Sequence, residues 1–286
     1  MSYALLVAGL KGAMFLESLP QDVWPSSIFY YRVLGEHESA FQRLVNVAGE
    51  AAQHVDPRTF DASPSSDLLV TVGWQYLIRN SQSLVVLHDS LLPKFRGFAP
   101  TVTALILGEL NLGVTALLAS EEMDSGPILS QHSVTVDQFI TIQGAFEALA
   151  DCYVRCLQDV LLMGSDLNSF AKRQDNSKAT YSLWRDDDDF QIQWDKSAEE
   201  IVRMVNAVGY PYAGAKTSLE NRALTVSRAE LAKDLHFENR QPGKIWRRHD
   251  SFSVDVVCGS GIVRIWAMWR DGAPTEVFTK LRSRLT

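Results

Sequence analysis

Short apolar runs alternate with stretches of helical spacing through the first two thirds of the chain. The apolar runs have the length and the Val, Leu and Ile content of β-strands, whereas the longer stretches repeat apolar residues at intervals of three and four. Strands are predicted at residues 4–8, 28–33, 68–72, 84–88, 114–119 and 128–134, and helices at 13–19, 38–54, 99–107 and 138–162. This alternation predicts an α/β fold built on an open, mostly parallel sheet.

The last third of the chain has a different pattern. Ser, Asn, Lys and Gln dominate residues 164–190, and Arg185 is followed by four consecutive aspartates. We interpret this stretch as a connector, because adjacent carboxylates repel one another and favour a solvated loop over a metal site. A predicted helix follows, and then come short β patterns typical of a small antiparallel barrel or sandwich. These elements are expected at 197–208, 223–226, 243–246, 253–257 and 261–268.

The connector predicts two domains, at residues 1–180 and 190–286. Charge is uneven between them, since residues 1–189 carry 12 Lys/Arg against 23 Asp/Glu and residues 190–286 carry 15 against 11. Proteins that bind nucleic acid have a much more basic footprint, so no nucleic-acid partner is expected. The formal net charge of −7 is compatible with a small anionic ligand. The oligomeric state stays open, with a homodimer among the alternatives.

The cysteines and the apolar runs indicate the compartment. Cys152 and Cys156 share a face of one predicted helix, but no histidine lies nearby at zinc-like spacing, so no metal is expected. Three thiols in all suit the reducing cytoplasm. Residues 1–9 form an apolar strand without a basic flank, so we expect no signal peptide. No apolar run is long enough to cross a bilayer, and no membrane partner is expected.

Candidate chemistry lies at the end of the strand predicted at 84–88. His88 is its last residue, and Asp124 lies in a second loop 36 residues further on. Ligands of open α/β sheets bind where strands end, and an imidazole beside a carboxylate can move protons near neutral pH. Each residue also has a structural alternative, which is a capping role for the histidine and an Asx-turn for the aspartate.

The turn after the first strand contains Gly9 and Gly12. A dinucleotide loop requires the fuller Gly-x-Gly-x-x-Gly pattern, which this chain lacks. We therefore predict a tight strand-to-helix turn.

A longer motif surrounds His88 and Asp124. The chain reads His-Asp-Ser-Leu-Leu-Pro over 88–93, Gly-Val-Thr over 113–115 and Asp-Ser-Gly over 124–126. Over residues 84–130 it thereby resembles the 10-formyltetrahydrofolate-dependent formyltransferases. That family has an Asn-His-Asp triad, so the resemblance implies that His88 and Asp124 are catalytic. The family's Asn stands two residues before its His, where this chain has Val86.

The resemblance also implies a fold and a donor. It implies a Rossmann-like catalytic domain, a small C-terminal barrel, and 10-formyltetrahydrofolate as the donor of the formyl group. Residues implied or expected to contact this donor are Ser90, Leu91, Leu92, Pro93, Ile78 and Met123. On the acceptor side we expect Arg96, Gly97, Trp74, Gln75, Tyr181, Trp184 and Lys11. Arg96 could equally pair with an acidic neighbour, and Gln75 or Asn80 could replace the missing Asn.

The acceptor is predicted from the absence of an inserted loop in the first domain. Relatives that formylate methionyl-tRNA carry a basic inserted loop in the first domain, whereas here Gly35 leads directly into a predicted helix. We therefore predict transfer to the free amine of an amino sugar, nucleotide-linked or of the nonulosonic, pseudaminic-acid type, for cell-surface glycan biosynthesis. Methionyl-tRNA formylation stays an alternative. Val86 keeps open a second alternative, a non-catalytic ligand-binding member of the fold.

Overall fold

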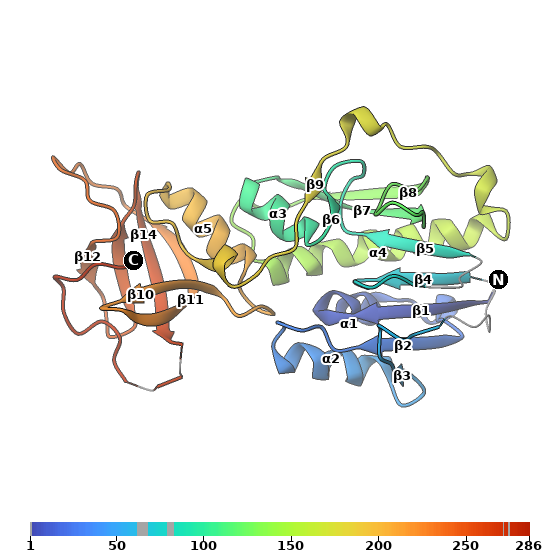
Figure 1. Ribbon diagram of the computed structural model, residues 1–286, viewed down its shortest axis with the longest axis horizontal. Helices are drawn as coiled ribbons and strands as arrows, with labels where there is room; N and C mark the ends of the chain where they lie inside the picture. The colour runs from blue at the N-terminus through green and yellow to red at the C-terminus, as the bar shows by residue number, and fades with distance from the viewer. Residues whose placement is uncertain (1, 62–67, 79–82, 271, 274) are drawn as a thin grey trace. The chain divides into compact units, whose positions relative to one another are not determined.

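The computed structural model describes residues 2–61, 68–78, 83–270, 272–273 and 275–286. These residues form two compact units (Figure 1). The first unit contains residues 1–101, 110–136 and 144–184, and the second contains residues 102–109, 137–143 and 185–286. The second unit thus takes two short segments from the first two thirds of the chain.

A seven-stranded sheet forms the centre of the first unit, in the order β3-β2-β1-β4-β5-β7-β8. All adjacent pairs are parallel except those of β7, which runs antiparallel to both β5 and β8. The predicted α/β class with a mostly parallel sheet is confirmed. The strands are β1 (Tyr3–Ala8), β2 (Ser27–Tyr31), β3 (Gln53–His54), β4 (Leu68–Val72), β5 (Leu84–His88), β7 (Asn111–Leu118) and β8 (Ile128–Thr135).

Helices pack against this sheet, and two of them meet directly on one face. Phe15 of α1 and Tyr153 of α4 have ring centroids 6.0 Å apart and are both fully buried, so they help to form the core. The helices are α1 (Gly9–Ser18), α2 (Glu38–Ala48), α3 (Pro100–Leu107) and α4 (Ile142–Met163). Single 3-10 turns lie at η1 (Gln21–Val23), η2 (Leu167–Ser169), η3 (Asn176–Lys178) and η4 (Asp188–Phe190).

The helix predicted at 38–54 was wrong in its length. Helix α2 ends at Ala48, because Gly49 follows with φ 80° and its N–H donates to the carbonyl of Val45. Gly adopts this backbone conformation without the steric cost of a Cβ and so ends helices. Residues Gln53–His54 then form β3 at the edge of the sheet.

A five-stranded antiparallel sheet forms the second unit, in the order β10-β11-β14-β13-β12. Helix α5 (Ala198–Ala207) begins with a capping box, in which the side chains of Ser197 and Glu200 each accept from the other residue's backbone N–H. The helix packs on β11 through its buried face, including Ile201 and Val205. The strands are β10 (Ala215–Leu219), β11 (Arg222–Ala232), β12 (Ile245–Arg248), β13 (Ser253–Val257) and β14 (Ile262–Trp269).

The aspartate run is not simply a solvated loop, as the sequence had suggested. The carboxylate of Asp187 forms ion pairs with Lys216, at 2.5 Å, and with Arg270, at 2.6 Å. The Lys216 side chain is only 7% exposed, so this pair ties the run to β10. Asp186 and Asp189 organise the turn itself, since the N–H of Asp186 donates to the Asp189 carboxylate.

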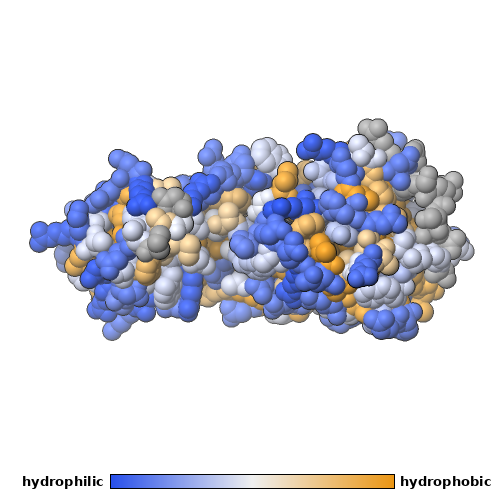
Figure 2. Space-filling view, turned by 90° about the horizontal axis from the view of Figure 1, so that it is seen from below, coloured by the Kyte–Doolittle hydropathy of each residue, from blue (hydrophilic) through white to orange (hydrophobic). Residues whose placement is uncertain are grey.

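The face in Figure 2 is mostly hydrophilic, and the cysteines are buried. On the face shown in Figure 2, hydrophobic residues reach the surface in small patches between hydrophilic ones. Within the described residues, no helix is long and apolar enough to cross a membrane. Cys152, Cys156 and Cys258 are buried free thiols, and burial raises the pKa of each one.

Candidate active site

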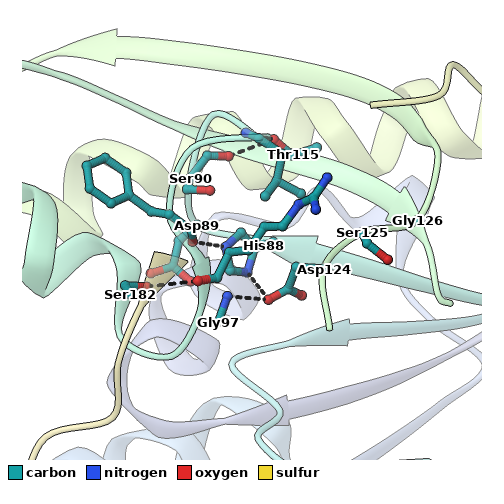
Figure 3. Close-up of polar contacts among 12 residues, drawn as sticks. His88, Asp89, Ser90, Gly97, Thr115, Asp124, Ser125, Gly126 and Ser182 are labelled. Carbon is teal, nitrogen blue, oxygen red and sulfur yellow. Dashed lines mark hydrogen bonds and ion pairs between the residues drawn. The ribbon is translucent and has the colours of Figure 1, made fainter. Parts of the chain in front are cut away.

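His88 ends β5 and lies between a backbone carbonyl and a carboxylate (Figure 3). Its Nε2 is 2.9 Å from the carbonyl oxygen of Phe95, and its Nδ1 is 3.6 Å from Oδ2 of Asp124. A carbonyl oxygen can only accept, so Nε2 carries a proton and donates it. Nδ1 is therefore the nitrogen that is left to take up a proton, and it faces Asp124.

Asp124 is held in place by a neighbouring loop. Its Oδ2 accepts a hydrogen bond from the backbone N–H of Gly97 at 2.8 Å, and its backbone has φ 52°. The side-chain amide of Gln174 donates to the carbonyl oxygens of Asp124 and Gly126, at 2.8 and 2.7 Å. The carboxylate thus points toward His88 and does not close an Asx-turn within its own loop.

The Gly97 backbone fits only a residue without a side chain. Its φ is 100°, and an added Cβ would lie 2.5 Å from the carbonyl oxygen of Ser182. This close approach comes from the pairing of β6 (Arg96–Gly97) with β9 (Tyr181–Ser182). The sequence prediction placed Gly97 on the acceptor side, and its N–H is used for Asp124.

Arg96 is directed into the protein. The residue is 2% exposed, and its guanidinium donates to the side-chain oxygens of Gln174 and Asn176. Its partners are amides and not the acidic neighbour considered from the sequence. Arg96 therefore links the loop after His88 to the segment that fixes Asp124.

The loop Ser90–Pro93 is held by two hydrogen bonds to the hydroxyl of Thr115. The hydroxyl of Thr115 donates to the Ser90 carbonyl at 2.6 Å and accepts from the Leu92 N–H at 3.1 Å. Ser90 and Leu92 are 5% and 4% exposed, whereas Leu91 and Pro93 are half-buried. The four predicted donor contacts thus divide into two buried anchors and two residues that reach the surface.

A buried ion pair lies on the other side of His88. Lys11 Nζ is 2.7 Å from Oδ1 of Asp89, and the Thr101 hydroxyl donates to the same carboxylate. Burial works to raise the pKa of Asp89. The charge of Lys11, then that of His88, and hydrogen bonds from Lys11 and Thr101 outweigh burial and lower this pKa to about 2. The positive charge of Lys11 is therefore already neutralised by the protein.

The turn after β1 binds the side-chain carboxylate of Glu36. Gly9 opens α1 with φ 68°, and the N–H of Leu10 donates to Oε2 of Glu36 at 2.9 Å. Burial raises the pKa of Glu36, although this hydrogen bond and the charge of Lys11 oppose the shift. The predicted tight strand-to-helix turn is confirmed, with Glu36 at the helix start.

Trp74 belongs to an aromatic cluster at the ends of β2 and β4. Its ring lies 4.9 Å from that of Tyr31 and 5.6 Å from that of Phe60. Within the described residues, its indole Nε1 is buried and has no hydrogen-bond partner. Gln75 is exposed, and its backbone N–H donates to the Tyr31 hydroxyl. Trp74 thus forms an apolar wall that includes an unused donor.

The remaining predicted contacts differ in exposure. Tyr181 is 68% exposed, Trp184 is 62% exposed and Met123 is 52% exposed, so all three are available to a ligand. Ile78 is half-buried. Asn80 lies outside the described residues. Val86 is half-buried and contributes no polar group beside His88.

Four positioning residues were missed from the sequence. Thr101 and Gln174 bond to the site from segments outside the motif, whereas Thr115 lies in the Gly-Val-Thr motif but was not assigned a role. Asp89 lies inside the motif, but alternation along a strand points it away from His88. Its pairing with Lys11, 78 residues away, could not be deduced from periodicity.

Two other features of the described residues carry no comparable chemistry. His132, Ser130 and Arg155 surround Asp159, but the serine and the histidine both donate to the carboxylate, so no nucleophile is activated. An open depression of about 810 Å³ on α1 and α2 contains no predicted residue. Its lining residues are Glu17, His37, Glu38, Ser39, Gln42, Arg43, Asn46 and Val47. Within the described residues, no group of three or more metal-ligating side chains occurs.

Comparison with known families identifies two matching segments. Residues 63–161 match the family Formyl transferase, and residues 185–276 match the family Formyl transferase, C-terminal domain. The first match contains His88 and Asp124. The second match covers most of the unit built on β10–β14.

One relative of known name matches about two thirds of the chain. A methionyl-tRNA formyltransferase of Caldanaerobacter subterraneus subsp. tengcongensis is 28% identical over 186 residues, which are 65% of this chain and 59% of that protein. The chain thus matches less than two thirds of this relative's length.

Two solved structures share the fold. An N-formyltransferase of Helicobacter canadensis, in complex with folinic acid and dTDP-3-aminofucose, has a TM-score of 0.63 at 13% identity and covers 93% of this chain and 98% of its own. HypX of Aquifex aeolicus, in complex with tetrahydrofolic acid, has a TM-score of 0.63 at 16% identity and covers 92% and 43%.

Proposed function

The chain belongs to the formyl transferase family, and from this premise we propose that it transfers a formyl group from 10-formyltetrahydrofolate to the free amine of an amino sugar. The observation that carries this proposal is the placement of His88 between the Phe95 carbonyl and the Asp124 carboxylate. His88 is buried at the end of β5, the Asp124 side chain is 12% exposed, and Nδ1 of His88 faces the carboxylate.

The donor supplies a formyl carbon that an amine can attack. An amine attacks only in its neutral form, so a base must take its proton. Nδ1 of His88 accepts this proton, and the carboxylate of Asp124 stabilises the imidazolium that results. Because Nε2 is anchored on Phe95, the ring keeps its orientation while Nδ1 changes its protonation state.

The residues beside the site fit the ring systems of the donor. Met123, Tyr181 and Trp184 present exposed apolar surface on the unit that holds His88. Aromatic side chains stack readily on flat ring systems, and apolar walls with few polar groups are typical of small-molecule sites. Leu91 and Pro93 would add backbone and apolar contacts, held in place by the anchor at Thr115.

Charge favours a small acceptor over RNA. Residues 1–189 have 23 acidic against 12 basic side chains, and Lys11 and Arg96 are both bound to protein groups. An enzyme that reads tRNA neutralises several phosphates with free Lys and Arg. The aromatic wall at Trp74 suits a sugar ring instead, and we include the nonulosonic, pseudaminic-acid type among the acceptors. The free buried thiols suit the cytoplasm.

Methionyl-tRNA is the competing acceptor, because the matched relative from Caldanaerobacter formylates it according to its name. A competition experiment distinguishes methionyl-tRNA from an amino sugar as the acceptor. Methionyl-tRNA and a panel of nucleotide-linked and nonulosonic amino sugars are offered together with 10-formyltetrahydrofolate, and the formylated products are identified by mass spectrometry. We expect a formylated sugar as the main product. Formyl-methionyl-tRNA as the main product would show that the sugar assignment is wrong.

A further inference from the structure

A threonine lies beside the site on the neighbouring strand. Val86 and His88 are two residues apart on β5, so their side chains share one face of the sheet. Thr71 of β4 is the register partner of Val86 in a parallel pair, where partners point to the same side. Thr71 therefore lies on the His88 face, next to the position at which Val86 offers no polar group.

The hydroxyl of Thr71 forms no hydrogen bond within the described part of the chain. The residue is 3% exposed, yet among the described residues no hydrogen bond joins this hydroxyl to another group. Thr115, which is next to His88 in the register of β5 and β7, shows the usual arrangement, since its hydroxyl donates to Ser90. The hydroxyl oxygen of Thr71 is not among the fully buried side-chain atoms of the described residues that lack a partner, so it is open to a group that binds beside Val86.

The proposed reaction requires a donor at this place. When the amine nitrogen bonds to the formyl carbon, an electron pair of the C=O bond moves to the oxygen. That pair returns when the bond to the folate nitrogen breaks and a proton passes to that nitrogen. A donor near the oxygen stabilises the charge that develops in between. His88 has used its Nε2–H on Phe95, so the imidazole leaves this donation to another group.

The spacing allows Thr71 to be that donor. Neighbouring strands are roughly 4.8 Å apart and two residues along a strand span roughly 6.6 Å, so the backbones at Thr71 and His88 are about 8 Å apart. Two side chains on one face of a sheet at this separation can both contact the same small group. Resting on the proposed function, we propose that Thr71 is a further catalytic residue whose hydroxyl donates to the carbonyl oxygen of the formyl group.

The test compares Thr71→Val, which removes the hydroxyl at nearly constant shape, with Thr71→Ser, which keeps it. We expect Thr71→Val to lower kcat by roughly 100- to 1,000-fold with little change in KM, the range expected for loss of one such donor. Thr71→Ser should retain most of the turnover. Adding Val86→Asn to Thr71→Val supplies an amide on the same face and should restore part of kcat.

Thermal unfolding separates catalysis from structure. Because the hydroxyl forms no hydrogen bond to the described residues, the Tm of Thr71→Val should equal or exceed that of the wild type. A Tm of Thr71→Val well below that of Thr71→Ser would show a structural role and overturn the proposal, as would an unchanged kcat. If the wild type transfers no formyl group to any acceptor, the proposed function fails. An active wild type with an equally active Thr71→Val overturns only the role of Thr71.

Discussion

Gly97 donates its backbone N–H to the carboxylate of Asp124 across 2.8 Å, while its own Cα faces the carbonyl oxygen of Ser182. One backbone position thereby fixes the Asp124 carboxylate and the pairing of β6 with β9. Gly97→Ala should move this backbone, since the new Cβ would lie 2.5 Å from that oxygen. We expect at least a tenfold loss of kcat and a lower Tm.

The control for Gly97→Ala is Gly164→Ala. Gly164 also has a positive φ, of 71°, but nothing lies within 4 Å of an added Cβ. It therefore measures the backbone strain alone, which costs about 1–3 kcal/mol. A Gly97→Ala variant that loses no more stability and no more activity than Gly164→Ala would show that the contact with Ser182 is not restrictive.

His88→Asn and Asp124→Asn should each lower kcat by roughly 10²- to 10⁴-fold, the range for removing an acid–base group. The double variant should lose little more than the worse single one, because the two residues act as a unit. Steady-state kinetics with saturating donor measure all three variants. His236→Asn, at a side chain that is 87% exposed, is the matched control and should keep wild-type turnover. A near-wild-type kcat for either site variant would remove that residue from the mechanism.

The ion pair of Lys11 with Asp89 should stabilise the fold, and its contribution should depend on pH. Removing one partner leaves the other buried and charged, which costs about 3–5 kcal/mol. Lys11→Met and Asp89→Asn should both lower the free energy of unfolding, measured by urea titration at pH 7. The double variant should lose less than the sum of the two, because it leaves no unpaired charge.

The pH dependence follows from the pKa of Asp89, which is lowered from 3.8 to about 2 in the folded protein. A depressed carboxyl pKa stabilises the fold above the unfolded value, and this contribution is lost as the pH falls through the folded value. The wild type should therefore lose stability between pH 4 and pH 2 more steeply than Asp89→Asn. Parallel curves for the two proteins over this range would contradict the ion pair.

The parts of the fold that were predicted correctly are those that local sequence determines. Residues 68–72 and 84–88 are apolar runs bounded by polar residues, and β4 and β5 have these bounds. The helix predicted at 38–54 was too long, because apolar spacing continues past Gly49 although the backbone turns there. His88 and Asp124 were found through a motif and lie together. The partners of Lys11 and Arg96 come from segments about 80 residues away, and no local pattern encodes such pairings.

The domain boundary is a remaining proposal, and limited proteolysis can place it. Asp187 binds Lys216 and Arg270, and Arg185 donates to Thr103, so the start of the second unit is fixed by contacts within that unit. Lys178 precedes these contacts, and its side chain is 75% exposed. We therefore expect trypsin to cleave first after Lys178 and to spare Arg185.

Two variants test this order of cleavage. Lys178→Gln removes the first site and should slow the appearance of the two large fragments, whereas Lys196→Gln, at a side chain that is 51% exposed, should not. Asp187→Asn weakens the pairs with Lys216 and Arg270 and should make Arg185 cleavable. Mass spectrometry of the early fragments identifies the sites. First cleavage within 190–286, or cleavage at Arg185 in the wild type, would show that the boundary does not lie between Lys178 and Arg185.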